Sequence, residues 1–222
     1  MSNEEYRQMA DDFFEKTNDL VALHEYCQNL LKIPTLQRLL DKSKINKRFQ
    51  ECTFDKYKTT TDAQVKAKQQ AIDYARNIKE HFETGTNLIF TGNGCVGTGK
   101  THLACAVAQE VMKQGIPSKF INVTSMISEI KEKFDITEYL EVDLLVIDDL
   151  GKEKGTEWVC EQIYSILNSR YEAKKPTVIT TEGSIDDLEY NYGKNGNAII
   201  SRLVQKFVLV DLSGSDFRKQ RS

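Results

Sequence analysis

The pattern of hydrophobic and polar positions changes character near residue 62. Between residues 4 and 31, hydrophobic side chains such as Tyr6, Met9 and Phe13 recur at helical spacing, which predicts one amphipathic helix. From about residue 62 onward, helical periods alternate with short and continuous apolar runs. Such runs are typical of strands that are buried on both faces of a sheet.

The alternating segments predict a parallel sheet that is covered by helices. The expected strands are 87–91, 118–123, 143–147, 177–181 and 207–212, and the expected helices are 63–82, 100–113, 125–134, 156–173, 185–190 and 198–204. Their alternation favours a three-layer, doubly wound α/β fold with a five-stranded parallel sheet. A chain of 222 residues suits one such domain, expected at 61–222, and a small helical N-terminal region with a linker at 1–60.

The strongest chemical signal follows the first expected strand. Its residues fit the phosphate-binding pattern G-x4-G-K-Ser/Thr and are Gly94, Cys95, Val96, Gly97, Thr98, Gly99, Lys100 and Thr101. Glycines let the backbone curl so that its N–H groups face phosphate oxygens, and the following helix adds its positive end. Lys100 is expected on the β- and γ-phosphates and the Thr101 hydroxyl on Mg²⁺. The sequence therefore predicts a P-loop that binds ATP with Mg²⁺.

Two aspartates end the apolar run at 144–147. We expect Asp148 in the Mg²⁺ shell and Asp149 beside the attacking water, with an N-cap or loop-stabilising role as the alternative for Asp149. One complete strand fits between the P-loop helix and these acids, which is typical of additional-strand P-loop ATPases. On this interpretation the acidic strand lies next to the P-loop strand.

Later polar residues are candidates for contacts with the γ-phosphate. Thr180 and Thr181 end an expected strand, and we favour Thr181 over Glu182 because an ionised glutamate cannot donate a hydrogen bond. Arg202 follows a glycine-containing turn and is a candidate arginine finger toward a neighbouring subunit, while Arg218 could touch the nucleotide of its own subunit. The alternatives are ordinary strand residues for the threonines and surface ion pairs for the arginines.

Charge is distributed unevenly along the chain. The net charge of −3 excludes a uniformly basic nucleic-acid coat but not a local basic patch. Residues 4–31 carry seven acids and two bases, a net of −5, whereas residues 32–58 carry eight bases and three acids, a net of +5. This reversal indicates an interaction arm, with a solvated helix surface as the alternative. Lys131, Lys133 and Phe134 are candidates for single-stranded DNA contacts, with a solvated helix end as the alternative.

Cysteine and histidine usage argues against a zinc site. The five cysteines include no C-x-x-C pair, and the three histidines form no ligand cluster in the sequence. An odd number of cysteines and a polar, acidic N-terminus favour the reducing cytoplasm. Since no apolar run approaches the roughly 20 residues of a membrane-spanning helix, we expect no membrane partner.

Taken together, these motifs resemble the DnaC-type helicase loaders and the related IstB-type ATPases of the AAA+ superfamily. The resemblance covers roughly residues 45–222 and is carried by Gly97-Thr-Gly-Lys-Thr-His-Leu-Ala104, the acidic strand Val142–Gly151 and Cys52-Thr-Phe-Asp-Lys-Tyr57. It implies an AAA+ ATPase core in which His102 extends the nucleotide-binding segment. It also implies a role in the initiation of DNA replication, with a replicative hexameric helicase, single-stranded DNA and further copies of the chain as partners.

Two departures from the family pattern keep alternatives open. Asp149 stands where many AAA+ proteins have glutamate, and Glu182 stands near the position where the family often has asparagine. A shorter acid implies slow hydrolysis, so a nucleotide-binding adaptor with little hydrolysis is one alternative. An IstB-like transposition ATPase, which would bind double-stranded DNA and a transposase, is another.

Overall fold

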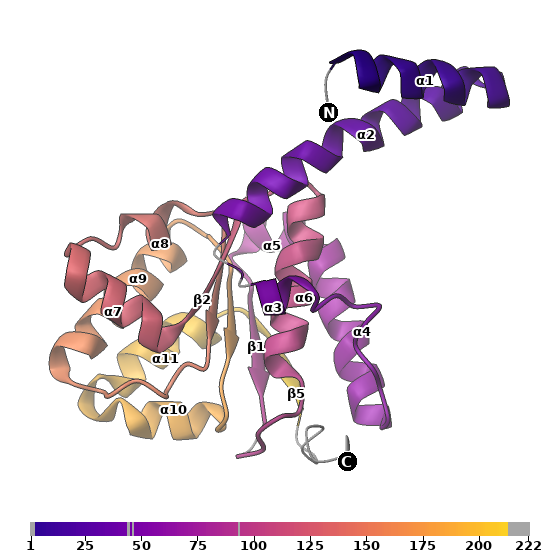
Figure 1. Ribbon diagram of the computed structural model, residues 1–222. Helices are drawn as coiled ribbons and strands as arrows, with labels where there is room; N and C mark the ends of the chain where they lie inside the picture. The colour runs from indigo at the N-terminus through magenta and orange to yellow at the C-terminus, as the bar shows by residue number, and fades with distance from the viewer. Residues whose placement is uncertain (1–2, 44, 46, 93, 213–222) are drawn as a thin grey trace.

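Five parallel strands form a sheet at the centre of the protein (Figure 1). The computed structural model describes residues 3–43, 45, 47–92 and 94–212. The strands are β1 (Asn87–Thr91), β2 (Ser118–Asn122), β3 (Leu144–Asp148), β4 (Thr177–Thr180) and β5 (Phe207–Asp211). The expected five-stranded parallel α/β fold is therefore confirmed, with strand bounds that differ from the expected ones by one residue.

The strand order is β2-β3-β4-β1-β5, so β4 lies between the P-loop strand and the acidic strand. Val178 at the middle of β4 pairs with Leu88 on one side and with Val146 on the other. The expectation that the acidic strand lies next to the P-loop strand is therefore wrong. The added strand fills the space between β1 and β3, and its last residue stands between the P-loop and Asp148.

Helices cover both faces of the sheet (Figure 1). One face carries α3 (Lys47–Gln50), α4 (Asp62–Arg76), α5 (Ile78–Thr84) and α6 (Lys100–Lys113). The other carries α7 (Val123–Lys133), α8 (Thr137–Glu141), α9 (Glu157–Glu172), α10 (Ile185–Asn191), the 3₁₀ turn η1 (Gly193–Asn195) and α11 (Gly196–Val204). None of the helices in the described part of the chain is long and apolar enough to cross a membrane.

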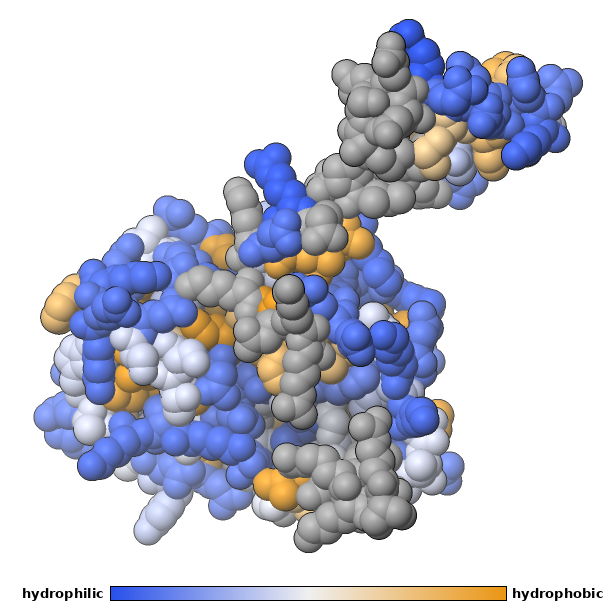
Figure 2. Space-filling model, viewed as in Figure 1, coloured by the Kyte–Doolittle hydropathy of each residue, from blue (hydrophilic) through white to orange (hydrophobic). Residues whose placement is uncertain are grey.

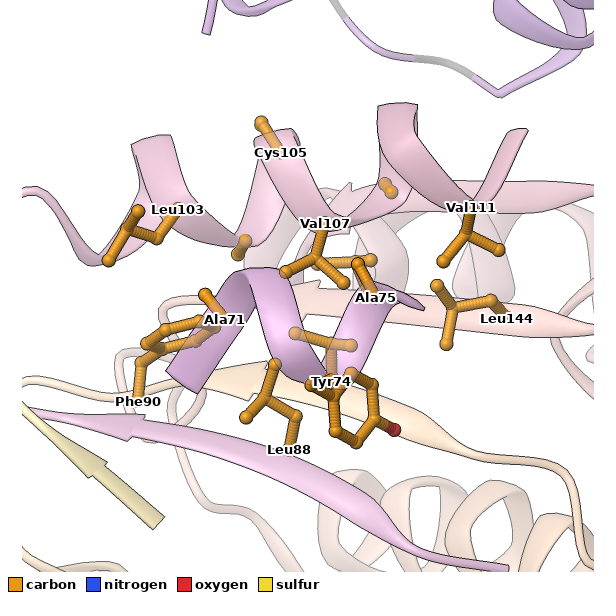
Figure 3. Close-up of a cluster of buried hydrophobic side chains, with 14 of the residues drawn as sticks. Ala71, Tyr74, Ala75, Leu88, Phe90, Leu103, Cys105, Val107, Val111 and Leu144 are labelled. Carbon is orange, nitrogen blue, oxygen red and sulfur yellow. The ribbon is translucent and has the colours of Figure 1, made fainter. Parts of the chain in front are cut away.

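Alternation along each strand divides the core into two layers. Leu88 and Phe90 of β1 pack with α4 and α6, whereas Ile89 between them packs with the helices of the opposite face. Figure 3 shows Leu88 and Phe90 close to Ala71 and Tyr74 of α4. Every residue of β1 is buried, because each face of the strand meets a helical layer.

The N-terminal segment forms two helices, α1 (Asn3–Thr17) and α2 (Leu20–Lys42), so the expectation of one helix over 4–31 is wrong. Asn18 adopts a left-handed conformation with a φ of 49°, and the Asp19 carboxylate caps α2 by accepting two main-chain N–H groups. The rings of Phe13 and Tyr26 stack with their centroids 4.1 Å apart, which holds α1 along α2. The helix expected at 63–82 is likewise divided, at Asn77.

The inner half of α2 and the segment after it pack on the α/β body that is built around the sheet (Figure 1). Leu36, Leu39 and Leu40 contact the hydrophobic cluster that includes α6, and the Phe120 N–H donates to the Ser43 carbonyl oxygen. Helix α1 and the outer half of α2 project from the body. We call this projecting part the arm.

Arg170 of α9 is buried, with 1% of its surface exposed, and it joins three elements of the second layer. Its guanidinium donates to one hydroxyl and four carbonyl oxygens, those of Thr177, Tyr139, Val142, Asp143 and Pro176. Burial lowers the pKa of Arg170 to about 9, so the group is still charged at neutral pH. The side chain thereby ties the end of α8 to the starts of β3 and β4.

We expect Arg170→Gln to lower the free energy of unfolding by about 3–5 kcal/mol, because buried carbonyl oxygens lose their donors. The matched control is Arg76→Gln, which removes the same charge from an exposed position on α4 and should change stability by less than about 0.5 kcal/mol. Urea unfolding followed by circular dichroism measures both. Equal midpoints for the two variants would contradict the structural role of Arg170.

Candidate nucleotide-binding site

The phosphate-binding loop connects the end of β1 to α6, and close packing forces glycine at two of its positions. Gly99, with a φ of 95°, lies against the Tyr57 ring, and a Cβ atom at Gly99 would lie 2.6 Å from that ring. A Cβ atom at Gly92 would lie 2.4 Å from the Lys100 Nζ atom. The two glycines therefore leave the space that Tyr57 and the Lys100 amine occupy.

Lys100 lies inside this loop rather than in open solvent. Its Nζ atom donates to the Cys95 carbonyl oxygen at 2.7 Å and to the Thr98 hydroxyl at 3.3 Å. Burial lowers the pKa of Lys100, and the carboxylates of Glu182 and Asp149 partly offset that effect. A partly desolvated cation surrounded by loop acceptors suits the binding of phosphate oxygens.

The two predicted metal ligands, Thr101 and Asp148, lie in direct contact. The Thr101 hydroxyl donates to Asp148 Oδ1 at 2.9 Å, and the Thr180 hydroxyl donates to the same oxygen at 2.7 Å. Burial raises the pKa of Asp148, and the bonds from Thr180 and Thr101 act in the opposite direction. Hydroxyl and carboxylate oxygens are the ligand types that Mg²⁺ prefers, so this donor set fits the ion.

At the end of β4, Thr180 rather than Thr181 contacts the acids. The Thr180 hydroxyl also accepts the main-chain N–H of Asp149 at 2.8 Å. Thr181 is buried, and its main-chain N–H donates to the Phe90 carbonyl oxygen at 2.9 Å. Thr180, the last residue of β4, is thus the threonine that contacts Asp148, and the contact of Thr181 with the γ-phosphate stays a prediction.

Two side chains contact the same carboxylate oxygen of Asp149. Its φ of 60° is left-handed, and Oδ2 accepts from Asn122 Nδ2 at 3.4 Å and pairs with Lys152 Nζ at 3.1 Å. The Lys152 amine also pairs with Glu182 Oε1 at 2.6 Å. Asn122 and Lys152 were not expected from the sequence. Asn122 ends β2 in register with Asp148, a pairing that only the folded sheet reveals.

One cleft brings together most of the predicted phosphate-binding and metal-binding groups, although Gly94 and Cys95 are not part of its lining. Its volume is about 990 Å³, and its lining includes Lys100, Thr101, Asp148, Asp149, Lys152 and Glu182. The predicted loop residues Val96, Gly97, Thr98 and Gly99 line the same cleft. A cleft with loop N–H groups, a buried lysine and a hydroxyl–carboxylate pair fits a triphosphate with Mg²⁺.

His102 contacts the segment 52–57, which precedes α4. Its ring makes a hydrogen bond of 2.8 Å with the Thr53 carbonyl oxygen and meets the Tyr57 ring edge-on at 5.3 Å. The Tyr57 hydroxyl in turn donates to the Thr98 carbonyl oxygen at 3.3 Å. The segment Cys52-Thr-Phe-Asp-Lys-Tyr57 therefore contacts the phosphate-binding loop, and His102 positions that segment.

Arg202, which was predicted to reach the γ-phosphate of a neighbouring subunit, does not line the cleft of its own subunit. Arg202 donates to Asn168 Oδ1 at 2.7 Å, and its guanidinium lies over the ring of Tyr171. Its carbonyl oxygen accepts from Asn87 at the start of β1, the strand end opposite the P-loop. Arg218 lies outside the described residues.

Comparison with known proteins identifies curated relatives. The replicative helicase loader DnaC of Escherichia coli K12 is 29% identical over 162 residues, which cover 69% of this chain and 64% of that protein. The phage-like element PBSX protein XkdC of Bacillus subtilis is 32% identical over 170 residues, covering 69% and 62%. The matched region thus spans less than two thirds of the length of either relative.

Solved structures share the fold. The crystal structure of the DnaC helicase loader matches with a TM-score of 0.66 and 28% identity, over 75% of this chain and 99% of that one. The crystal structure of DnaI matches with a TM-score of 0.63 at 20% identity, which supports the fold alone. The sequence profile described as IstB-like ATP binding protein matches residues 11–222. The chain therefore belongs to the family of IstB-like ATP-binding proteins, with an AAA+ core of the DnaC type.

Proposed function

We propose that this protein is an ATP-dependent helicase loader that acts in the initiation of DNA replication. It would bind a replicative hexameric helicase and single-stranded DNA, and it would use ATP with Mg²⁺. The observation that carries the proposal is the match to the DnaC helicase loader, at 28% identity and a TM-score of 0.66 over 75% of this chain. The cleft around Lys100 supports the nucleotide part of the proposal.

The cleft offers groups for the phosphates, the metal and the attacking water. The loop N–H groups and Lys100 bind the phosphates, while Thr101 and Asp148 hold the metal. When bound, Mg–ATP supplies an electrophilic γ-phosphate and the charge that stabilises the leaving oxygen. Asp149 orients the attacking water and accepts its proton, and Thr180 holds Asp148 and Asp149 in place. The Asp149 carboxylate pairs with the Lys152 amine at 3.1 Å, and this ion pair must open before the carboxylate can accept a proton, which implies slow turnover.

The arm is the proposed helicase-binding part. Leu20 and Val21 are 71% and 79% exposed, and both lie at the start of α2, where α1 meets α2. Figure 2 shows hydrophobic surface among hydrophilic surface at this outer end of the arm. Exposed apolar side chains on a projecting helical pair suit docking to another protein.

Single-stranded DNA is proposed to bind beside the end of α7. Phe134 caps this helix in a left-handed conformation and is 87% exposed. The Lys131 amine lies 5.5 Å from the centre of the Trp158 ring, so a cation and aromatic rings lie in one region. Lys133 pairs with Glu129 and Glu138, which reduces its contribution to the local positive charge. An exposed ring beside a cation supports base stacking.

Self-assembly through the ATPase domains would give Arg202 its proposed function. Since Arg202 lies at the sheet end opposite the P-loop, it is suited to reach the γ-phosphate of a neighbouring subunit rather than of its own. Asn168 and Tyr171 already orient its guanidinium. Arg218 stays a candidate for a contact with the nucleotide of its own subunit.

An IstB-like transposition ATPase is the second candidate function. The observation that favours it is the family match over residues 11–222, whose description is IstB-like ATP binding protein. The two functions differ in the partner of the arm, a helicase in one and a transposase in the other. Capture of purified helicase and of purified transposase by the same arm therefore separates them.

The nucleotide assignments predict two different defects. Lys100→Ala should weaken Mg–ATP binding at least about tenfold, because a phosphate loses its charge-assisted donor. Asp149→Asn should keep affinity within about twofold and lower kcat about 10²–10⁴-fold, because it removes a general base. Calorimetry and phosphate release on the same samples measure the two effects. Wild-type turnover by Asp149→Asn would contradict the role of Asp149.

The arm assignment predicts that Leu20→Ser combined with Val21→Ser weakens helicase binding at least about fivefold, through loss of apolar contact. The control is Val65→Ser, which removes a side chain that is 53% exposed on α4. Biolayer interferometry against the purified host helicase measures both. Helicase binding by the arm variant as tight as by the control would exclude this surface.

The DNA assignment predicts that Phe134→Ala weakens binding of oligo(dT) about 5- to 100-fold, as expected for the loss of one stacked base. Tyr190→Ala is the control, since Tyr190 on α10 is 86% exposed and equally aromatic. Fluorescence anisotropy at several salt concentrations measures affinity and its salt dependence. An equal loss in both variants would contradict the assignment.

A further inference from the structure

The loop after β3 returns toward the nucleotide cleft and carries Lys152 with it. The Lys152 N–H donates to the Asp149 carbonyl oxygen at 3.1 Å, which closes a turn. The Glu153 carboxylate accepts the Gly151 N–H at 3.0 Å and also accepts the hydroxyl of Tyr192, the residue that follows α10. These bonds hold the turn at both ends, so the backbone of Lys152 has a defined position beside the cleft.

The Lys152 amine lies between two carboxylates of the cleft. It pairs with Glu182 Oε1 at 2.6 Å and with Asp149 Oδ2 at 3.1 Å, while the side chain is still 41% exposed. Burial alone lowers the pKa of Lys152, but the bonds to Glu182 and Asp149 outweigh it, and the pKa is raised. The Lys152 amine thus stays protonated, and its partial exposure leaves it room to move within the cleft.

The phosphate-binding loop and Lys152 are joined through Glu182. The Glu182 carbonyl oxygen accepts the Gly94 N–H at 2.7 Å, and its side chain reaches the Lys152 amine. Lys152 and Lys100 line the same cleft, and the charge of Lys152 acts to lower the pKa of Lys100. Both amines therefore line the cleft that would hold the phosphates.

The charges in the cleft call for a second cation. Asp149 and Glu182 line it together with Glu129 and Asp148, and the Mg²⁺ proposed at Asp148 leaves Lys100 alone to balance the remaining carboxylates. An ionised Glu182 beside the loop would repel a terminal phosphate unless a cation lies between them. Lys152 is the group in that position, because it already contacts Glu182.

We propose that Lys152 binds the terminal phosphate of ATP, with Glu182 as the positioning residue that holds the amine at the loop. The inference rests on the proposed use of ATP at the P-loop. When the amine moves from Asp149 to the phosphate, the Asp149 carboxylate is released to accept a proton from water. An ionised Glu182 cannot donate a hydrogen bond to the phosphate. It acts instead by holding the Lys152 amine, which is the donor.

The test compares the binding of a triphosphate and a diphosphate by the full chain. The probes are ADP and the β,γ-methylene analogue of ATP, each with Mg²⁺, in isothermal calorimetry. Lys152→Gln should raise the Kd of the triphosphate about tenfold, the loss expected for one charge-assisted hydrogen bond, and should change that of ADP by less than about twofold. Lys154→Gln is the control, because it removes the same charge from an exposed position in the same loop.

A double variant separates phosphate binding from simple charge neutralisation. If Lys152 only neutralised Glu182, Lys152→Gln combined with Glu182→Gln would restore wild-type affinity for the triphosphate, and the proposal would be overturned. If the amine binds the phosphate, the double variant stays weakened for the triphosphate alone. An equal loss for ADP and the triphosphate in Lys152→Gln, or no loss for either, would also overturn it.

Different outcomes of these experiments would overturn the proposed function and the inference about Lys152. Absence of Mg²⁺-dependent binding of either nucleotide by the wild-type chain, or unaltered binding by Lys100→Ala, would overturn nucleotide use at the P-loop and this inference with it. Triphosphate-selective binding in the wild-type chain that Lys152→Gln leaves unchanged would overturn this inference alone. Unfolding midpoints without nucleotide confirm that each variant is folded.

Discussion

The arrangement of the candidate site depends on one buried carboxylate, that of Asp148, and on the two hydroxyl groups that donate to it. Thr101 at the start of α6 and Thr180 at the end of β4 both bind Asp148 Oδ1. Only 4% of the Asp148 surface is exposed, and a buried carboxylate without donors would cost several kcal/mol. The donors that make its burial tolerable thereby align the phosphate-binding loop, the acidic strand and the inserted strand.

The local motifs of this site could be read from the sequence, because each follows from neighbouring residues. The loop before Lys100 has its glycines at fixed offsets, and Asp148 follows an uninterrupted apolar run. Strands β1, β2, β3 and β4 were predicted for the same reason, since a strand buried on both faces has no polar face to obscure it. β5 is partly exposed at the edge of the sheet, and its apolar run alone predicted it. Even the bounds of these strands differ by only one residue.

Other features depend on contacts between distant segments, and the sequence pattern did not predict them. The position of β4 between β1 and β3 follows from three-dimensional packing rather than from chain order. Lys152 and Asn122 reach Asp149 from different elements, and neither residue type marks a site on its own. The break between α1 and α2 did leave a local signal, because an aspartate after an asparagine commonly begins a helix.

The long α2 helix gives the protein the geometry of a lever. It contains 23 residues, which corresponds to a length of about 35 Å at 1.5 Å per residue. Its inner end is bound to the body through Ser43 and Phe120, and the following segment reaches the phosphate-binding loop through Tyr57. A tilt of about 10° at the inner end would displace the outer tip by about 6 Å over that length. A small movement of the phosphate-binding loop would thus produce a larger displacement at the outer tip of α2. Conversely, a force on that tip would act on the inner end of α2 and on the loop.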